Sequence, residues 1–249
     1  MELYDRIGRS YQQFRRADPR IAELVLQALG SAGSVVNVGA GVGSYEPVDR
    51  HVVAVEPSLT MIQQRPPSSA PVVRASACAL PFADSTFAAA LAILTIHHWP
   101  DKAKGLEELA RVARERVVLL TWDPSASGPG ARFWLIDEYF PEIPEMDRRI
   151  FPTIEDIERV LGRVSIVDVP IPRDCTDGFL GAYWRRPRAY LDPDVRGAIS
   201  AFAKLSNVDA RLERLRRDLD SGEWRRRHRS LLSACCLDLG YRLIVAHTR

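Results

Sequence analysis

The sequence predicts an α/β protein built on a doubly wound parallel sheet, and two observations lead to this fold class. Short β-branched runs alternate with amphipathic segments between residues 19 and 121, which is the order that a parallel sheet with helices on both faces produces. The run at residues 87–94 is apolar throughout, so that strand must be covered on both faces. The 249 residues, 46% of them hydrophobic, suffice for one large domain or two small ones.

The elements of the first half follow one another closely. Residues 19–29 predict an amphipathic helix, because apolar side chains recur at i, i+3, i+4 and i+7, and Gly30 ends it. Five apolar or β-branched runs are typical of strands, at residues 35–38, 52–55, 71–74, 87–94 and 116–121. Ser58 can cap a short helix that carries Met61, and residues 101–114 predict a further helix.

The pattern loosens after residue 122. Residues 123–152 combine turn residues with aromatic side chains and match no further βα unit. A helix is expected at residues 154–161 and a strand at 164–169, whereas residues 170–240 are mostly helical and strongly charged. A last strand closes the chain at residues 241–247. Because no linker separates two independent parts, we expect a single domain over the whole chain.

Composition excludes several classes of protein. The net charge of +2 shows no general attraction to nucleic acid or anionic lipid. The longest apolar run, residues 87–96, is about half of the ~20 residues that a membrane span needs. The N-terminus lacks a signal-peptide pattern, so a cytoplasmic location is predicted. The spacing of the four cysteines favours neither a zinc site nor a disulfide framework, and no metal is expected; free thiols in or near the core are expected at Cys78, Cys175, Cys235 and Cys236.

The strongest local signal is the glycine turn at residues 39–43, which follows the first strand, together with Glu56 at the end of the second. A glycine turn lets the backbone approach a ligand closely, and an acid at the next strand end can accept hydrogen bonds from ribose hydroxyls. The pair predicts a nucleoside-containing cofactor. Ser44 replaces the third glycine of the dinucleotide fingerprint, and no Lys-Ser/Thr follows as in a P-loop. The alternative is an ordinary tight turn beside a solvated carboxylate.

The chain resembles the class I S-adenosylmethionine-dependent methyltransferases, in which G-x-G-x-G ends the first strand and an acid ends the second. Residues 74–87 (RASACALPFADSTF) are similar to the "GDAxxLPFxDxSFD" segment of a small-molecule branch that includes the ubiquinone and menaquinone methyltransferases. Residues 96–101 (IHHWPD) and 105–108 (GLEE) resemble its "HHWPD" and "GLxE" stretches. The resemblance covers roughly residues 34–122. It implies S-adenosylmethionine as cofactor and a Rossmann-like, seven-stranded sheet whose last strand is antiparallel.

The resemblance also assigns cofactor contacts near the first two strands. The glycine turn would pass beneath the methionine part of the cofactor through Gly39, Ala40, Gly41 and Gly43. Glu56 would bind the ribose hydroxyls, with Pro57 beside it.

Further along, Met61 would lie against the adenine, and Ala77 would offer its backbone N–H to the ring. The carbonyl near Leu94 would meet the amino group of the cofactor. Ser76 stands where the family usually has Asp for the adenine amino group, and this neutral contact is weaker than a charged one by roughly 1 kcal/mol. Asn37 replaces the usual Asp of the first strand.

The N-terminal residues 1–30 are expected to form lid helices. In related methyltransferases such a segment folds over the cofactor, which would bring Tyr11 and Arg15 to it, with the guanidinium paired to the cofactor carboxylate. The alternative is a surface helix with solvated side chains.

Candidates for the chemistry follow strands four and five, because ligands of open α/β sheets bind beyond the carboxyl ends of the strands. His97 and His98 have the right unperturbed pKa for a base near neutrality, and His97 is favoured if one of them acts. The alternative is that they pack beneath the loop with Trp99. Asp123 could bind an amine or a hydroxyl of the substrate, or form a turn with Pro124.

The acceptor is expected to be a small molecule. Residues 94–97 (LTIH) lack the Asn/Asp-Pro-Pro-aromatic motif of enzymes that methylate base amines, and the Pro-Cys nucleophile of the 5-methylcytosine enzymes is missing too. Residues 34–122 would form the cofactor half, with residues 123–152 and 170–240 as a helical substrate cap. The arginine-rich residues 211–229 are diluted by acids and predict a solvated helix face, so a nucleic-acid partner is not expected. A homodimer is possible, because the sequence does not indicate the oligomeric state.

Two other classes of function remain as alternatives. An NAD(P)-dependent oxidoreductase would share the sheet, but Ser44 argues against it. A non-catalytic, methyltransferase-like regulatory or RNA-associated protein would bind the cofactor without turnover, with the arginine cluster as its sole support. The atom that is methylated cannot be read from the residues.

Overall fold

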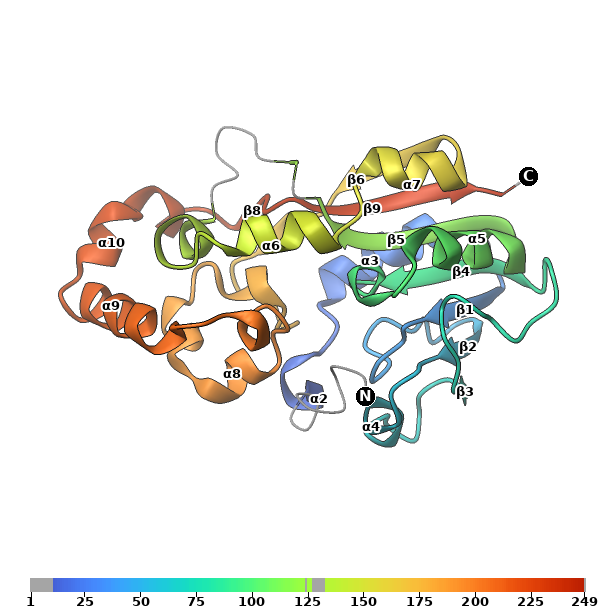
Figure 1. Ribbon diagram of the computed structural model, residues 1–249, viewed down its shortest axis with the longest axis horizontal. Coiled ribbons are helices and arrows are strands. Elements are labelled where there is room, and N and C mark those ends of the chain that lie inside the picture. Colours follow the sequence, from blue (N-terminus) through green and yellow to red (C-terminus); the bar gives the residue numbers. More distant parts are fainter. Residues whose placement is uncertain (1–10, 124, 127–132, 249) are drawn as a thin grey trace.

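A seven-stranded sheet forms the centre of the computed structural model, which describes residues 11–123, 125–126 and 133–248 (Figure 1). The strand order is β3-β2-β1-β4-β5-β9-β6. Only the two pairings of β9, with β5 and β6, are antiparallel. The strands are β1 (Ser34–Val38), β2 (His51–Val55), β3 (Val72–Val73), β4 (Phe87–Ile93), β5 (Ala113–Trp122), β6 (Val164–Asp168) and β9 (Tyr241–His247). The predicted fold class, with its antiparallel last strand, is confirmed.

Helices cover both faces of the sheet, as the apolar strand β4 required. Neighbouring residues of β1 point to opposite faces: Val35 packs in one apolar cluster with helix α3 (Pro19–Leu29), and Val36 packs in another with α5 (Lys102–Val112) and α7 (Ile154–Leu161). All but the last residue of β4 are buried. β5 begins directly after α5, two residues inside the predicted helix, because Ala113 already pairs with Phe87 of β4.

Helix starts are set by local capping. The Asp18 side chain accepts a hydrogen bond from the Arg20 N–H at the start of α3, and Asp101 caps α5 through the Lys104 N–H. The predicted cap of Ser58 on α4 (Leu59–Gln63) is present, with the Met61 N–H donating to Ser58 Oγ at 3.3 Å. Among the described residues, the short helix α2 (Tyr11–Phe14) precedes α3.

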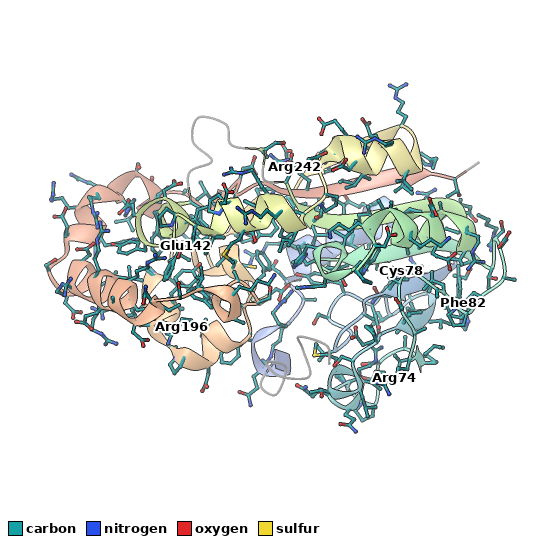
Figure 2. All side chains as sticks on the ribbon, viewed as in Figure 1. Arg74, Cys78, Phe82, Glu142, Arg196 and Arg242 are labelled. Carbon is teal, nitrogen blue, oxygen red and sulfur yellow. The ribbon has the colours of Figure 1, made fainter. Side chains whose placement is uncertain are left out.

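A second group of helices gathers beyond one end of the sheet (Figure 1). It contains a π-helix over Leu135–Tyr139, α6 (Ile143–Ile150), α8 (Pro193–Gly197), α9 (Val208–Asp220) and α10 (Glu223–Arg227). Single 3-10 turns connect them at Leu180–Tyr183, Pro187–Leu191, Phe202–Lys204 and Arg229–Leu232. Glu142 and Arg196 lie in this group, whereas Cys78 and Phe82 lie beside the sheet (Figure 2).

The helical group shares one core with the sheet. Trp134 is buried and lies edge-on to Trp224 at 5.2 Å and to Tyr190 at 5.8 Å between ring centroids. The same apolar cluster continues to Val35 and Leu91 in the sheet. The two parts therefore pack as one body. Trp224, the aromatic residue within the arginine-rich segment, is 3% exposed and presents no ring for stacking with bases.

A small ladder that the sequence did not predict joins β7 (Ile171–Pro172) to β8 (Cys236–Leu237). Two-residue strands leave no periodic pattern, so only tertiary contact reveals them. The expectation of four thiols in or near the core is wrong for Cys235 and Cys236, which are exposed: Cys236 lies in β8, which pairs only with β7, and Cys235 directly precedes it. No helix of the described ranges is long and apolar enough to cross a membrane.

Asp177 is a buried junction between segments that lie far apart in the sequence. Its carboxylate is fully buried and accepts hydrogen bonds from Arg15 Nε at 2.5 Å and from the Tyr45 hydroxyl at 3.0 Å. Next to it, the Gly178 N–H donates to the Phe14 carbonyl at 2.8 Å. The N-terminal segment is thereby tied to both the glycine turn region and the segment after β7.

We expect Asp177→Ala to lower the free energy of unfolding by about 3–5 kcal/mol, because it removes a fully buried carboxylate that pairs with Arg15 and accepts a hydrogen bond from the Tyr45 hydroxyl. Urea unfolding measures this loss. The matched control is Asp174→Ala, which removes an exposed carboxylate paired with Arg20 and should cost less than about 1 kcal/mol. Equal losses in both variants would contradict a structural role for the junction.

Candidate functional site

Two cavities adjoin beyond the carboxyl ends of the parallel strands. The larger has a volume of about 720 Å³, and both are lined by Arg15 and Leu94. The smaller cavity opens where β1 lies between β2 and β4, the point at which the strand order reverses. Open α/β sheets bind ligands at this place.

The glycine turn forms one wall of the smaller cavity. Gly39, Gly41 and Gly43 have φ angles of 71°, 53° and 88°, which favour glycine. The N–H groups of Gly39 and Ala40 both donate to the Val55 carbonyl, at 2.8 and 3.0 Å, and so anchor the turn to β2. A Cβ atom on Gly39 would stand 2.0 Å from Thr95 Oγ1. The backbone can therefore take this path only with glycine at position 39.

Glu56 is held against the turn by backbone donors. Its carboxylate is 5% exposed and accepts hydrogen bonds from the N–H groups of Gly41 and Ser58, both at 2.9 Å. These bonds orient the carboxylate at the cavity wall. An acid in this place suits the hydroxyls of a ribose.

A buried ion pair, which the sequence did not reveal, supports the turn from behind. Arg65 Nη2 lies 2.6 Å from Glu46 Oε1, and both side chains are less than a tenth exposed. Arg65 Nη1 also donates to the Gly41 carbonyl at 3.1 Å. No motif marks these two residues, because their pairing depends on how the turn folds back.

Most of the predicted cofactor residues meet at the smaller cavity, which is lined by Arg15, Gly39, Ala40, Gly41, Glu56, Pro57, Met61, Ser76, Ala77 and Leu94. Gly43 does not line it, and a Cβ there would instead approach Glu46 Oε2 at 3.0 Å. The side chain of Tyr11 and residues 1–10 of the expected lid lie outside the described residues. The smaller cavity is also lined by residues that were not assigned to the cofactor from the sequence, namely Asn37, Val42, Ser44, Tyr45, Ser58, Ile93, Thr95, Trp99 and Pro100.

The chemistry of this wall fits a nucleoside-type cofactor. Asn37 is 3% exposed, and its Oδ1 has no hydrogen-bond partner within the described part of the chain. A buried acceptor without a donor is costly, so this atom suits an N–H or ammonium group of a ligand. Met61, buried beside Gly41, supplies an apolar surface for a flat ring.

The two predicted histidines divide between the cavities, His97 at the larger and His98 at the smaller. Their rings lie 3.8 Å apart, and His97 stacks on Phe151 with 4.1 Å between centroids. Burial lowers the pKa of His97 well below its usual value, and the charge of nearby Lys204 adds to the effect. Burial lowers the pKa of His98 to about 3. Both imidazoles are therefore neutral at pH 7. His97 packs against Phe151, and a neutral imidazole can also act as a base.

Asp123 lines the larger cavity directly after β5. Its Oδ1 accepts hydrogen bonds from the Ser125 N–H at 2.8 Å and from the Ser125 hydroxyl at 2.6 Å. The side chain thus forms a turn and also faces the cavity.

The larger cavity has a mostly apolar wall that contains one buried acid not identified from the sequence. Asp147 on α6 is 7% exposed and lines the cavity. Burial raises the pKa of its carboxyl to about 6, and the positive charge of Lys204 opposes that rise. In the sequence it stands among charged residues, as in a solvated helix face. The remaining wall is largely aromatic and aliphatic, from Leu94, Trp122, Phe133, Ile136, Ile143, Ile150, Phe151, Phe179, Leu180, Ile199, Leu239 and Tyr241.

Comparison with known proteins agrees with this geometry. Residues 36–121 match the family described as methyltransferase domain. A search of curated proteins gives no match. Among solved structures, the chain is similar to a protein of Anabaena variabilis assigned to an antibiotic biosynthesis pathway as a methyltransferase, with 33% identity, a TM-score of 0.85, and 94% of this chain and 99% of that chain covered.

Two more distant structures share the fold. One is geranyl diphosphate C-methyltransferase from Streptomyces coelicolor with S-adenosyl-L-homocysteine, at 16% identity and a TM-score of 0.52, covering 93% of this chain and 76% of that chain. The other is phosphoethanolamine N-methyltransferase 2 of Haemonchus contortus with S-adenosyl-L-methionine, at 15% identity and a TM-score of 0.59, covering 98% and 59%.

The raised pKa of Asp147 predicts a pH-dependent cost to stability. Between pH 4 and pH 6 the unfolded chain, with its usual pKa of 3.8, ionises this group before the folded protein does. The free energy of unfolding therefore falls as the pH rises through this window, by roughly 3 kcal/mol in all. Asp147→Asn should lack this loss and gain stability relative to wild type at pH 7.5 but not at pH 4.

Urea unfolding of both proteins at several pH values measures the effect. Glu158→Gln on α7, which replaces an exposed carboxylate, is the control and should show a difference from wild type that hardly changes with pH. A difference between wild type and Asp147→Asn that stays constant from pH 4 to pH 7.5 would contradict the burial effect.

Proposed function

Because the chain belongs to the S-adenosylmethionine-dependent methyltransferases and S-adenosylmethionine is its cofactor, we propose that it methylates a small-molecule acceptor in the larger cavity. The observation that carries this proposal is the cavity of about 720 Å³ that adjoins the cofactor cavity at Leu94 and Arg15. Its volume lies within the ~300–1,000 Å³ of small-molecule sites. An acceptor there would lie next to the cofactor rather than on an open surface.

The cofactor would be held by the residues that line the smaller cavity. Glu56 would accept hydrogen bonds from the ribose hydroxyls, while the turn of Gly39 and Gly41 admits the methionine part. Asn37 Oδ1 would accept from its ammonium group. Arg15 would reach its carboxylate while remaining paired with Asp177.

The adenine end would lie between Met61 and the segment after β3. Ser76 and Ala77 line the cavity on that side, and Ser76 Oγ already accepts the Cys78 N–H at 3.2 Å. Pro57 completes this wall. The roles of Tyr11, Ala40, Gly43 and Leu94 toward the cofactor stay predictions.

The chemistry requires little of the protein beyond positioning. The cofactor supplies an electrophilic methyl group on a sulfonium sulfur. The protein must align the acceptor atom with that methyl group and exclude water, which the apolar wall of the larger cavity favours. We propose that neutral His97 contacts the acceptor through Nδ1, a buried atom with no partner among the described residues.

The helical group would serve as the substrate cap. Residues 123–152 supply Phe133 and Asp147 to the larger cavity, and residues 170–240 supply Phe179 and Ile199. Acceptor choice would then reside in these segments, with residues 34–122 as the cofactor half. The N-terminal lid, the cytoplasmic location, a homodimer and the ubiquinone and menaquinone branch stay predictions.

Glu56→Gln should weaken the binding of S-adenosylhomocysteine by roughly 10- to 100-fold, because hydrogen bonds to a charged group contribute about 1.5–3 kcal/mol. Isothermal titration calorimetry measures the affinity, and thermal unfolding checks the fold. Glu158→Gln is again the matched control and should bind as wild type does. An unchanged affinity in Glu56→Gln would remove Glu56 from the ribose site.

The acceptor class is tested by following transfer of a radioactive methyl group from S-adenosylmethionine to candidate acceptors. The protein is incubated separately with a library of amines, phenols, alcohols and carboxylic acids, with total RNA, and with protein. We expect label in the small-molecule library only. Ala201→Trp, which places an indole at the larger cavity, should abolish the transfer while S-adenosylhomocysteine affinity is kept.

In the same assay His97→Phe retains an aromatic ring against Phe151 but lacks the nitrogen, and turnover should fall by roughly 10²-fold. Label in RNA or protein that Ala201→Trp leaves unchanged would contradict the proposed function. Full turnover in His97→Phe would remove only His97 from it.

A further inference from the structure

The larger cavity contains a feature that bears on the identity of the acceptor. We propose that this cavity selects acceptors that combine an apolar body with a basic nitrogen, and that Asp147 pairs with that nitrogen. The inference rests on the proposed function, since it assumes that the acceptor occupies the larger cavity.

The buried carboxylate of Asp147 is the first observation. It is 7% exposed, it lines the cavity, and its side chain makes no hydrogen bond or ion pair within the described residues. A carboxylate taken out of water is costly unless a cation or hydrogen-bond donors compensate it. A ligand that brings a cation to this place would supply the missing partner.

Two other carboxylates with buried side chains form ion pairs. Arg65 Nη2 lies 2.6 Å from Glu46 Oε1, and Asp177 forms an ion pair with Arg15. Three other ionisable residues at the cavity wall have partners: Arg15 pairs with Asp177 at 2.5 Å, Arg148 with Glu145 at 3.5 Å, and Asp123 accepts from Ser125 at 2.8 Å. Asp147 is a carboxylate at the same wall that is 7% exposed and has no ion pair among the described residues, which points to a ligand rather than to the fold.

The aromatic wall is the second observation. Five aromatic side chains line the cavity, namely Trp122, Phe133, Phe151, Phe179 and Tyr241. The faces of such rings attract a cation and also cover an apolar body. A carboxylate together with aromatic faces suits an ammonium group, whereas aromatic faces repel a carboxylate ligand.

Lys204 supports the alternative that the cavity binds an acidic acceptor, because its ammonium group could pair with a carboxylate. It also lines the cavity and interacts electrostatically with Asp147. Lys204 is exposed as a residue, although partial burial of its ammonium group lowers its pKa, whereas Asp147 is only 7% exposed and burial raises its pKa. The group that gains more from a ligand of opposite charge is therefore Asp147.

Three probes with the same apolar body distinguish these chemistries. Binding of 2-(1-naphthyl)ethylamine, 2-(1-naphthyl)ethanol and 3-(1-naphthyl)propionate is measured by calorimetry at pH 7.5 on the full chain saturated with S-adenosylhomocysteine. We expect the amine to bind about tenfold or more tightly than the alcohol, and the propionate most weakly. Asp147→Asn should remove the preference for the amine, and Asp147→Glu, which keeps the charge, should retain most of it.

Glu158→Gln is the matched control and should keep the wild-type preference. The inference is overturned if wild type binds the amine no more tightly than the alcohol, if the propionate binds most tightly, or if Asp147→Asn keeps the preference. The comparison of probes on wild type stands even where a variant does not fold, which thermal unfolding reports. In the methyl-transfer assay, radioactive label in alcohols or acids with no preference for amines would refute this inference alone. Label in RNA or protein would refute the proposed function.

Discussion

The contact between Gly39 and Thr95 constrains the whole site. The turn after β1 and the turn after β4 approach so closely that a single methyl group on residue 39 would overlap the Thr95 side chain. Leu94, which precedes this contact, lines both cavities, and His97 and His98 follow it within three residues. The close approach of two backbone turns thereby places the walls of the smaller and the larger cavity side by side.

Buried charge is distributed in two ways around this centre. Glu46 and Arg65 compensate one another behind the glycine turn, and Asp177 compensates Arg15 where the N-terminal segment crosses. These pairs hold the backbone in place, because removal of either partner would leave the other charge uncompensated. Asp147 has none within the described part of the chain, and a pKa of about 6 is the consequence of its burial. Ion pairs thus hold the backbone around the glycine turn, whereas the buried carboxylate of Asp147 faces the larger cavity without one among the described residues.

The fold and much of the lining of the smaller cavity were predictable for local reasons. The apolar runs at residues 35–38, 52–55 and 87–94 became β1, β2 and β4 with ends shifted by about one residue, because continuous burial leaves a continuous pattern. Ten of the twelve residues expected to bind the cofactor line one cavity, since the glycine turn and the strand ends follow one another in sequence. Asp147, Arg65 and the β7–β8 ladder were not predictable in this way. Their neighbours are distant in the chain, and each of them looks locally like surface or loop.

The sequence by itself determined the order of strands and helices between residues 19 and 121 and the positions of the glycine turn and of Glu56, because hydrophobic periodicity and backbone conformation are properties of short segments. Tertiary structure decided which charges are buried, which of them are paired, and how residues 133–240 enclose a cavity against the end of the sheet. Burial and the pKa shifts that follow from it depend on every atom that excludes water from a side chain. That environment exists only once the distant segments have packed together.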